Sequence, residues 1–189
     1  SFSGGGLPGV SDTLVGALWT LDFMLLLAQY GCSGVNMETG VNQLGFLSCY
    51  SPVRDDAEGR ASAGVPYYGM LAFAEARRGC TELLPIDGDV GGIDATAYVL
   101  GRSGKPVSVV VVNRDKAREA LVSVRGLAMG ELTVLRLRAP EKESPGGVTL
   151  GGSSVTAEGL WRAAARERIR DGMLRVPAMS AAVARVAGA

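Results

Sequence analysis

Three glycines near the start of the chain have a spacing that is used elsewhere for phosphate binding. Gly4, Gly6 and Gly9 match G-x-G-x-x-G within SFSGGGLPGVSD. In a dinucleotide-binding turn, a strand comes directly before these glycines, a helix begins at them, and an acidic residue lies about 20 residues further on at a strand end. Here residues 1–3 precede the glycines, residues 8–10 separate them from the predicted helix, and Asp22 falls inside that helix. The spacing alone therefore does not predict a nucleotide site.

Other catalytic chemistries are limited by residue types. The sequence has no histidine, which excludes Ser-His-Asp and Cys-His mechanisms built from this chain alone and any zinc site that needs imidazole. Cys32, Cys49 and Cys80 form no C-x-x-C pair, and we expect buried free thiols. The sequence predicts no metal site and no cofactor.

Charge and hydropathy also limit the expected partners. The formal net charge is zero, so electrostatics gives no reason to expect nucleic acid or an anionic membrane surface. The basic stretch Arg162–Arg170 is interrupted by Glu167, and we expect it to be a solvated face or loop. The most apolar stretch, Leu14–Ala28, contains Asp22 and is shorter than the roughly 20 apolar residues that cross a bilayer. We therefore expect a buried helix there, and the glycine-rich N-terminal stretch does not have the pattern of a secretory signal peptide.

The first eighty residues have helical periodicity. Residues 11–31 predict a helix, with Ser11 and Asp12 as caps and Gly31 as a left-handed stop. It is apolar on nearly all sides, so we expect protein to cover most of its surface. Residues 32–40 predict a short buried strand and a turn, and a second helix is expected from Pro66 to Gly79. This order of elements is typical of a β/α architecture.

The pattern changes after Cys80. Short β-rich runs recur about every dozen residues, with turn formers between them, and Gly151-Gly152 can close a two-residue hairpin. Such spacing indicates an antiparallel sandwich or barrel. We therefore expect two domains, residues 1–80 and 81–189. The predicted strands are TAYVLGR, VSVVVVN, ALVSVR, LTVLRLR, GVTLGG, LRVPA and AAVARV.

One family resembles this chain over essentially its whole length. The segment GGGLPGVSDTLVGALWTLDFMLLLAQYG is similar to the heparanase and β-glucuronidase family, glycoside hydrolase family 79, and the similarity is most specific over residues 4–31. PYYGMLAFAEA resembles that family's eighth barrel helix. The resemblance implies the last β/α units of a (β/α)8 TIM barrel followed by an antiparallel β-sandwich domain, with a β-linked uronic acid glycoside (a glucuronide or heparan-like sugar) as substrate.

The resemblance also implies that the catalytic residues are not in this chain. A retaining glycosidase uses two carboxyl groups about 5–5.5 Å apart. In the family these are glutamates at the ends of barrel strands four and seven, and the second lies a few residues before the glycine triplet. We therefore expect no catalytic residue here, no glycosidase activity of the chain alone, and a need for the missing N-terminal barrel portion or for self-association.

The same resemblance suggests which residues contact the sugar. In the family, backbone amides and tyrosine hydroxyls of two loops hold the uronic acid carboxylate. Gly4 and Gly5 match the amide donors, and Ser3 stands where relatives often carry a tyrosine. Gly45-Phe46 stands about where relatives have Gly-Tyr, so a second hydroxyl is also missing.

Two further residues complete the candidate site. Glu38 follows the expected eighth strand, at the end of the barrel where active sites form, and is able to contact a sugar hydroxyl. Tyr50 is close enough in sequence to replace the missing tyrosine hydroxyl.

Simpler interpretations stay open for these residues. One alternative is that Gly4–Gly6 form a tight turn and bind no ligand. Another is that Glu38 is a loop carboxylate with a structural partner. Trp19 and Phe23, four residues apart, are expected in the core rather than under a sugar. For the whole chain the alternative is a non-catalytic carbohydrate-binding or interaction module whose β-sandwich is the functional part.

Overall fold

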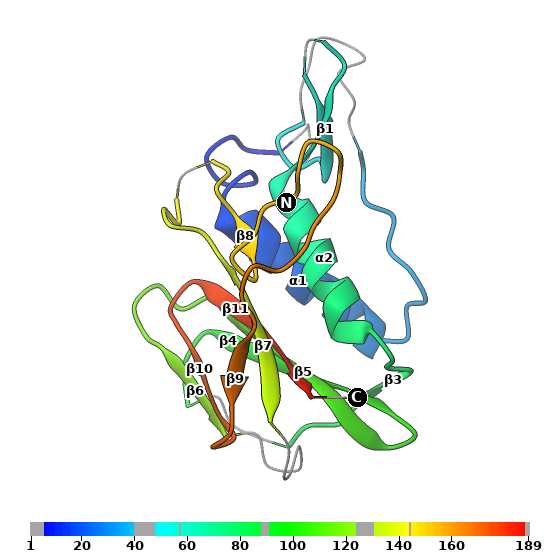
Figure 1. Ribbon diagram of the computed structural model, residues 1–189, viewed down its shortest axis with the longest axis vertical. Helices are drawn as coiled ribbons and strands as arrows, with labels where there is room; N and C mark the ends of the chain where they lie inside the picture. The colour runs from blue at the N-terminus through cyan, green and yellow to red at the C-terminus, as the bar shows by residue number, and fades with distance from the viewer. Residues whose placement is uncertain are drawn as a thin grey trace.

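The computed structural model describes residues 6–39, 48–56, 58–87, 91–123, 131–143 and 145–187. Helices occupy the upper part of the molecule and antiparallel sheets the lower part, and a small hairpin projects beyond the helices (Figure 1). The elements are α1 (Leu14–Gln29), β1 (Val53–Asp55), β2 (Ala61–Ala63), α2 (Val65–Arg77), β3 (Glu82–Leu84), β4 (Ala95–Arg102), β5 (Lys105–Asn113), β6 (Ala120–Ser123), β7 (Leu132–Arg138), β8 (Thr149–Leu150), β9 (Glu167–Ile169), β10 (Met173–Val176) and β11 (Ser180–Val186).

Helix α1 begins later than the sequence predicts. Thr13 is the N-cap, and its side chain makes no capping hydrogen bond. Ser11 and Asp12 are buried and accept hydrogen bonds from the backbone of the preceding loop, at Leu7 (3.0 Å) and Gly9 (2.7 Å). The prediction that they cap the helix is therefore wrong, because the same oxygens are used to fold the glycine-rich loop back on itself.

The surface of α1 is only partly covered. Leu14, Leu21 and Leu25 are fully buried. The other side of the helix carries an apolar stripe that stays accessible, and the expectation of cover on most sides is not met by the described residues. We call these four residues the outer stripe of α1: Val15, Trp19, Phe23 and Leu26, of which Phe23 is half-buried and the others are 37–40% exposed.

The segment after α1 also differs from its prediction. Gly31 has the expected positive φ of 83° and ends the helix. Residues 32–39 then run past the helices as an extended segment that belongs to no sheet in the described part of the chain. Val35 and Met37 are half-buried, and the residues between and around them are exposed. The buried strand predicted here is thus wrong for this structure, because no neighbouring strand supplies a ladder.

Helix α2 follows its prediction closely. It begins at Val65 with Pro66 in the first turn, where proline's missing N–H costs nothing, and Gly79 beyond its end has a φ of 72°. The helix packs on α1 at Gly69, where a Cβ would overlap the carbonyl oxygen of Ala17 and lie 2.7 Å from Cβ of Thr20. This close approach of the two backbones requires glycine.

A seven-stranded antiparallel sheet lies beneath the helices. Its order is β3-β4-β5-β11-β7-β8, with β9 paired to β7. One face shares a core with both helices, in which Leu21, Tyr98 and Val110 are buried together. The structure thus has mixed α/β architecture, and the barrel and the sandwich themselves stay predictions.

The opposite face of the sheet has its own cover. Strands β10 and β6 pair with each other and enclose a second core, which includes Val111, Leu174 and Ala184. All seven predicted β-rich runs contain a strand. Gly151-Gly152 does form a two-residue turn, because Leu150 and Ser153 exchange backbone hydrogen bonds of 3.1 and 3.2 Å across it. The sequence did not predict β1, β2, β3 or β9, each of which has three residues.

Polar contacts also join the helices to the sheet. The Asp22 carboxylate accepts hydrogen bonds from Thr96, from Tyr98 (2.9 Å) and from Arg114 (2.6 Å). At the far end of α2, buried Arg185 of β11 donates to the carbonyl oxygens of Glu75 and Ala76, both at 3.1 Å. The two parts on either side of residue 80 therefore share an interface, and the domain division there stays a prediction.

Glu75 makes a second set of these contacts. Its buried carboxylate pairs with Arg78 at 2.5 Å and with Arg166 of the loop after β8 at 3.2 Å. Because an ionised carboxylate is costly to bury without partners, these two arginines and the loop that carries Arg166 are held against α2.

None of the three cysteines forms a disulfide in the described structure, as expected. Cys49 is buried, Cys80 is half-buried and Cys32 is exposed, so the expectation of burial holds fully for one of them. Burial raises the pKa of the Cys80 thiol, which keeps it protonated near neutral pH. Within the described ranges, no helix has the length and hydropathy that a membrane crossing requires.

Candidate functional site

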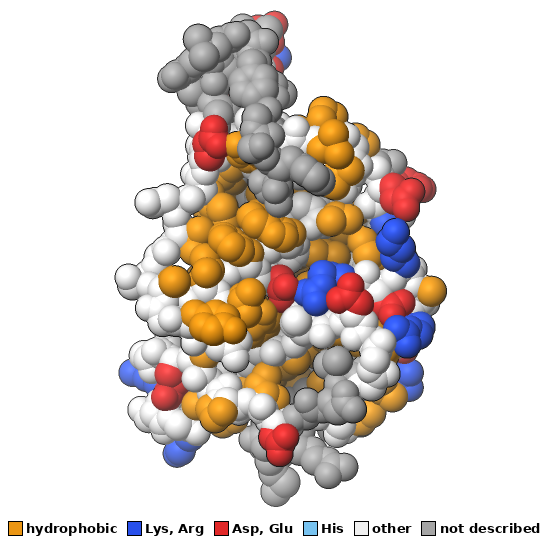
Figure 2. Space-filling model, turned by 180° about the vertical axis from the view of Figure 1, so that it is seen from behind, with side chains coloured by type: hydrophobic (Ala, Val, Ile, Leu, Met, Phe, Trp, Pro, Cys, Tyr) orange, Lys and Arg blue, Asp and Glu red, His pale blue; other side chains and the backbone are white. Residues whose placement is uncertain are grey.

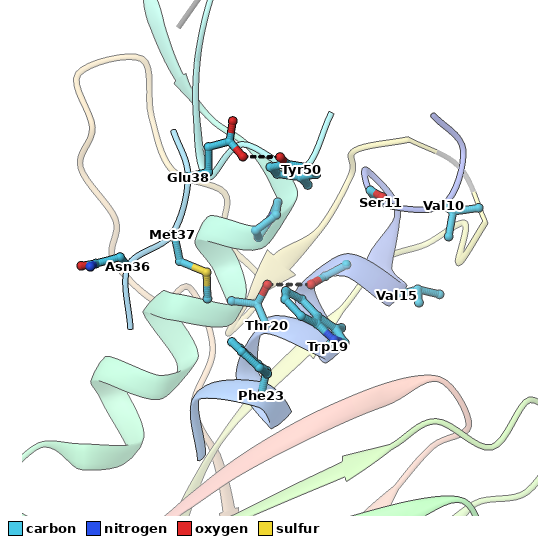
Figure 3. A pocket seen from close by; sticks show the side chains of 12 residues that line it. Val10, Ser11, Val15, Trp19, Thr20, Phe23, Asn36, Met37, Glu38 and Tyr50 are labelled. Atoms are coloured by element: carbon cyan, nitrogen blue, oxygen red, sulfur yellow. Dashed lines mark hydrogen bonds between the residues drawn. The ribbon is translucent and has the colours of Figure 1, made fainter. Parts of the chain in front are cut away.

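Two of the predicted site residues come together in the structure. The Tyr50 hydroxyl donates a hydrogen bond to Oε2 of Glu38 (Figure 3). Glu38 lies on the extended segment after α1, and Tyr50 lies in the turn before β1. Two segments that are separate in the sequence thus place a carboxylate and a phenol side by side.

This pair lies at one edge of a cavity of about 310 Å³. Residues 36–38 form one side, and Val15, Trp19 and Phe23 of the outer stripe of α1 form another (Figure 3). Pro66, at the start of α2, also lines the cavity. The rings of Trp19 and Phe23 stack with centroids 4.8 Å apart and planes inclined by 14°. The cavity therefore has an apolar, aromatic wall facing a polar edge, which is the usual composition of a small-ligand pocket.

The turn that carries Tyr50 is held by several local contacts. Buried Ser51 donates its hydroxyl to the carbonyl oxygen of Val53 at 2.6 Å, and Gly64 donates its N–H to the carbonyl of Pro52 at 2.9 Å. Arg54 donates to the carbonyl oxygen of Cys49. These bonds fix the direction in which the Tyr50 side chain leaves the backbone.

The glycine-rich loop packs directly behind Tyr50. Gly6 has a φ of 90°, and a Cβ on it would lie 2.8 Å from Cδ1 of Tyr50 and 2.7 Å from Sγ of Cys49. Only a residue without a side chain fits at this position. The last glycine of the triplet is therefore needed to let the loop approach the Tyr50 ring, a requirement that the sequence analysis did not assign to Gly6.

The remaining predicted site residues lie outside the described residues. These are Ser3, Gly4, Gly5, Gly45 and Phe46. Their expected contacts with a sugar stay predictions.

Most of the cavity wall was not predicted from the sequence. Trp19 and Phe23 were expected in the core, whereas Trp19 is 37% exposed and both rings line the cavity. Their spacing of four residues was the available signal, because it places both rings on one face of a helix. Asn36 and Met37 also line the cavity. In the strand predicted for this segment, adjacent side chains would point to opposite faces, so the two would not share one wall.

The side chains that line the cavity offer hydrogen-bond donors and acceptors for a ligand. Among the described residues that line the cavity, Glu38 supplies the carboxylate and Tyr50 the phenol, and no lysine or arginine is present. A double displacement at a sugar needs two carboxyl groups. One carboxylate with a hydroxyl beside it is suited to accept and donate hydrogen bonds to sugar hydroxyls. No group of three or more potential metal-ligating side chains occurs in the part of the chain that the structure describes.

Comparison with known proteins points to glycosidases. No protein-family model matches the chain. Over 71 residues the chain is 38% identical to a β-glucuronidase of Neurospora crassa. The matched segment covers 36% of this chain and 12% of that protein. This similarity is too short to assign the chain to a family.

Solved structures show the same fold over nearly the whole chain. A 4-O-α-L-rhamnosyl-β-D-glucuronidase from Fusarium oxysporum 12S, solved as a Rha-GlcA complex, matches 97% of this chain with a TM-score of 0.79 and 22% identity. A family GH51 arabinofuranosidase from Xanthomonas axonopodis pv. citri matches 96% with a TM-score of 0.59 and 17% identity. The chain spans 41% and 38% of these two proteins. Its fold is thus similar to a part of larger glycosidases.

Proposed function

We propose that this chain is the C-terminal part of a retaining glycoside hydrolase of family 79 that acts on β-linked uronic acid glycosides or related sugars. In this proposal residues 1–80 are the last β/α units of a (β/α)8 barrel and residues 81–189 are a β-sandwich domain. The observation that carries the proposal is the Glu38–Tyr50 pair beside an aromatic-walled cavity. The glycine-triplet resemblance and the fold similarity to two glycosidases support it.

The residues of this chain then have binding roles. Glu38 accepts a hydrogen bond from a sugar hydroxyl, and Tyr50 orients the Glu38 carboxylate by donating to its other oxygen. A carboxylate repels another carboxylate at close range, so Glu38 contacts the hydroxyl side of a uronic acid. The uronic acid carboxylate is left to the backbone amides of Gly4 and Gly5. The catalytic glutamates belong to the preceding part of the protein, so the 189-residue chain alone turns over no glycoside.

The outer stripe of α1 gives the proposal a structural consequence. Figure 2 shows the face of the molecule that is turned away in Figure 1, which is the side on which α1 lies. Apolar side chains gather over the upper half of this face. Val15, Trp19 and Leu26 supply part of this accessible apolar surface. Large exposed apolar patches are typical of interaction surfaces. In the complete enzyme, the rest of the barrel covers the part of this stripe that does not face the sugar, and in its absence the chain self-associates through the stripe.

Activity of the full-length protein tests this function. We expect hydrolysis of 4-nitrophenyl β-D-glucuronide, with a smaller rate on the matching β-D-glucoside. In the full-length protein, Tyr50→Phe removes the hydroxyl that orients Glu38, and kcat/KM should fall about 3- to 10-fold for both substrates, because a typical hydrogen bond contributes about 0.5–1.5 kcal/mol. Tyr30→Phe is the matched control, since Tyr30 is 80% exposed and does not line the cavity.

A second substitution separates the two contacts with the sugar. Gly5→Val blocks close approach of the backbone to the uronic acid carboxylate and should reduce hydrolysis of the glucuronide more than that of the glucoside. Equal losses on both substrates would mean that Gly5 provides room for the sugar ring and does not bind the uronic acid carboxylate. A full-length protein that binds sugars but hydrolyses none would favour the alternative of a carbohydrate-binding module.

A further inference from the structure

A second hollow lies on the other side of the start of α2. Pro66 lines the cavity beside Tyr50, and its neighbour Tyr67 lines this second hollow, which has a volume of about 280 Å³. One wall is the β1–β2 hairpin and the other is the loop that joins β8 to β9. In Figure 1 this loop rises from the sheet along α2 to the base of the hairpin. We call this hollow the loop cleft.

The loop is held in place at several points along its length. The backbone N–H of Val155 donates to the Tyr68 hydroxyl at 3.1 Å, and the Trp161 indole N–H donates to the carbonyl of Leu150 at 3.1 Å. Further along, Arg166 pairs with buried Glu75 at 3.2 Å. The loop therefore presents a fixed wall to the cleft.

The part of the loop that reaches the cleft is a tight turn. Thr156 accepts at its carbonyl from the N–H of Gly159 (3.0 Å) and donates its own N–H to the carbonyl of Leu160 (2.8 Å). Gly159 has a φ of 76°, which favours glycine in this turn. The Thr156 hydroxyl holds the pKa of the Glu158 carboxyl below its usual value, so Glu158 is an ionised hydrogen-bond acceptor at neutral pH.

The side chains that line the cleft suit a single neutral sugar. Tyr67 is a half-buried aromatic ring, Ser62 and Thr156 carry hydroxyls, and Glu158 carries a carboxylate. Between them stand small apolar side chains such as those of Ala61 and Ala157. Among the described residues that line the cleft there is no arginine or lysine, and Glu158 would repel a uronic acid. The volume lies near the lower end of ligand pockets, about 300–1,000 Å³, which is room for one ring and not for a chain of sugars.

We propose that the loop cleft is a second carbohydrate subsite, which binds a neutral sugar linked to the uronic acid held beside Glu38 and Tyr50. This inference depends on the proposed function. The first subsite is formed by residues before position 67, and the second is completed by a loop that belongs to the sheet region. The sheet region would then take part in substrate selection as well as in supporting the helices.

The test compares substrates with and without the additional sugar, in the full-length enzyme. The short substrate is 4-nitrophenyl β-D-glucuronide. The two extended substrates carry a neutral hexose, in one case on the 4-hydroxyl of the glucuronide and in the other as its leaving group. For wild-type enzyme we expect a larger kcat/KM on at least one extended substrate than on the short one.

Three variants then test the cleft itself. Tyr67→Ala and Glu158→Gln should each lower the ratio of kcat/KM between that extended substrate and the short one by about 3- to 30-fold, which is the range for loss of one or two sugar contacts. Leu160→Ala is the matched control, because Leu160 lies on the same loop, is 68% exposed and does not line the cleft. Glu158 is exposed, so its substitution leaves folding unchanged even where Tyr67→Ala does not.

The outcomes distinguish the two proposals. An active enzyme whose substrate ratio is the same in wild type, Tyr67→Ala and Glu158→Gln overturns the second subsite and leaves the proposed function intact. An enzyme that is inactive on every glucuronide overturns the proposed function, and the subsite that depends on it.

Discussion

The helical region and the sheet region of this chain differ in how completely they bury their apolar residues. In β5 the four consecutive valines from Val109 to Val112 are each at most 2% exposed, because the helices cover one face of the sheet and strands β6 and β10 cover the other. In α1, Leu21 is fully buried while Leu26 is 40% exposed. The sheet is covered on both faces, whereas the described residues cover only one side of α1. Exposed apolar surface of this kind is typical of interaction surfaces.

The largest effect should come from a charge in the completed core. Val110→Asp places a carboxylate where the side chain is fully buried between helices and sheet, and an unpaired buried charge is very costly. We expect no cooperative thermal transition by circular dichroism for this variant of the 189-residue chain. Val15→Asp makes the same change on the outer stripe and should keep the transition while reducing self-association. Loss of folding in both variants would remove the contrast between the two regions.

The two sides of α1 should respond differently to the same truncation. Leu21→Ala leaves a cavity between the helices and the sheet and should lower the free energy of unfolding by about 2–5 kcal/mol. Leu26→Ala, further along the same helix but on the outer stripe, should lower it by less than about 1 kcal/mol. Urea denaturation of both variants measures the difference. Similar losses at the two positions would indicate that the outer stripe is buried in solution.

The close approach of the two helices predicts a smaller effect. Gly69→Ala introduces a Cβ that overlaps the carbonyl oxygen of Ala17, so α1 and α2 must separate slightly, at a cost of about 1–3 kcal/mol. Gly34→Ala is the control, because nothing lies within 4 Å of a Cβ at that position. The midpoint of denaturant unfolding should shift for the first variant and stay near the wild-type value for the second.

The smallest predicted effect depends on pH and on the contact between the two regions. Burial, together with the hydrogen bond to Asp22, raises the pKa of Tyr98 far above its usual value. The folded protein thus binds this proton more tightly than the unfolded chain. The contribution of the Tyr98 hydroxyl to the free energy of unfolding is fully present below the unfolded pKa of about 10. It is lost progressively as the pH rises from there toward the raised pKa of the folded protein. Melting temperatures between pH 9 and 11 should fall less steeply for Tyr98→Phe than for wild type, and parallel curves would contradict the prediction.

Local sequence signals predicted much of the secondary structure. The run from Leu132 to Arg138 is a strand with the bounds expected, α2 begins and ends where Pro66 and Gly79 indicate, and the Gly151-Gly152 turn forms. Each of these depends on residues a few positions apart, whose backbone preferences act wherever the segment is placed. The short strands β1 and β9 were not predicted, because three residues carry too little periodicity to be distinguished from a loop.

The candidate site was predicted only in part for the same physical reason. Glu38 and Tyr50 were singled out one at a time, by position and by side-chain type, and the sequence did not indicate that they bond to each other. Their contact requires the extended segment after α1 to pass the turn before β1 at one particular distance. That distance is set by how α1 and α2 pack on the sheet and not by the residues between the two side chains.

The sequence by itself determined where the two helices and seven of the described strands form, which turns need glycine, and which chemistries are excluded by the lack of histidine. These properties follow from residue type and from preferences that act over a few residues. Only the tertiary structure decided that Ser11 and Asp12 bind the glycine loop, that Trp19 faces a cavity, and that the loop after β8 reaches the start of α2. Each depends on which surfaces of distant elements meet, and an element that is apolar on all sides carries no local signal for which side is left open.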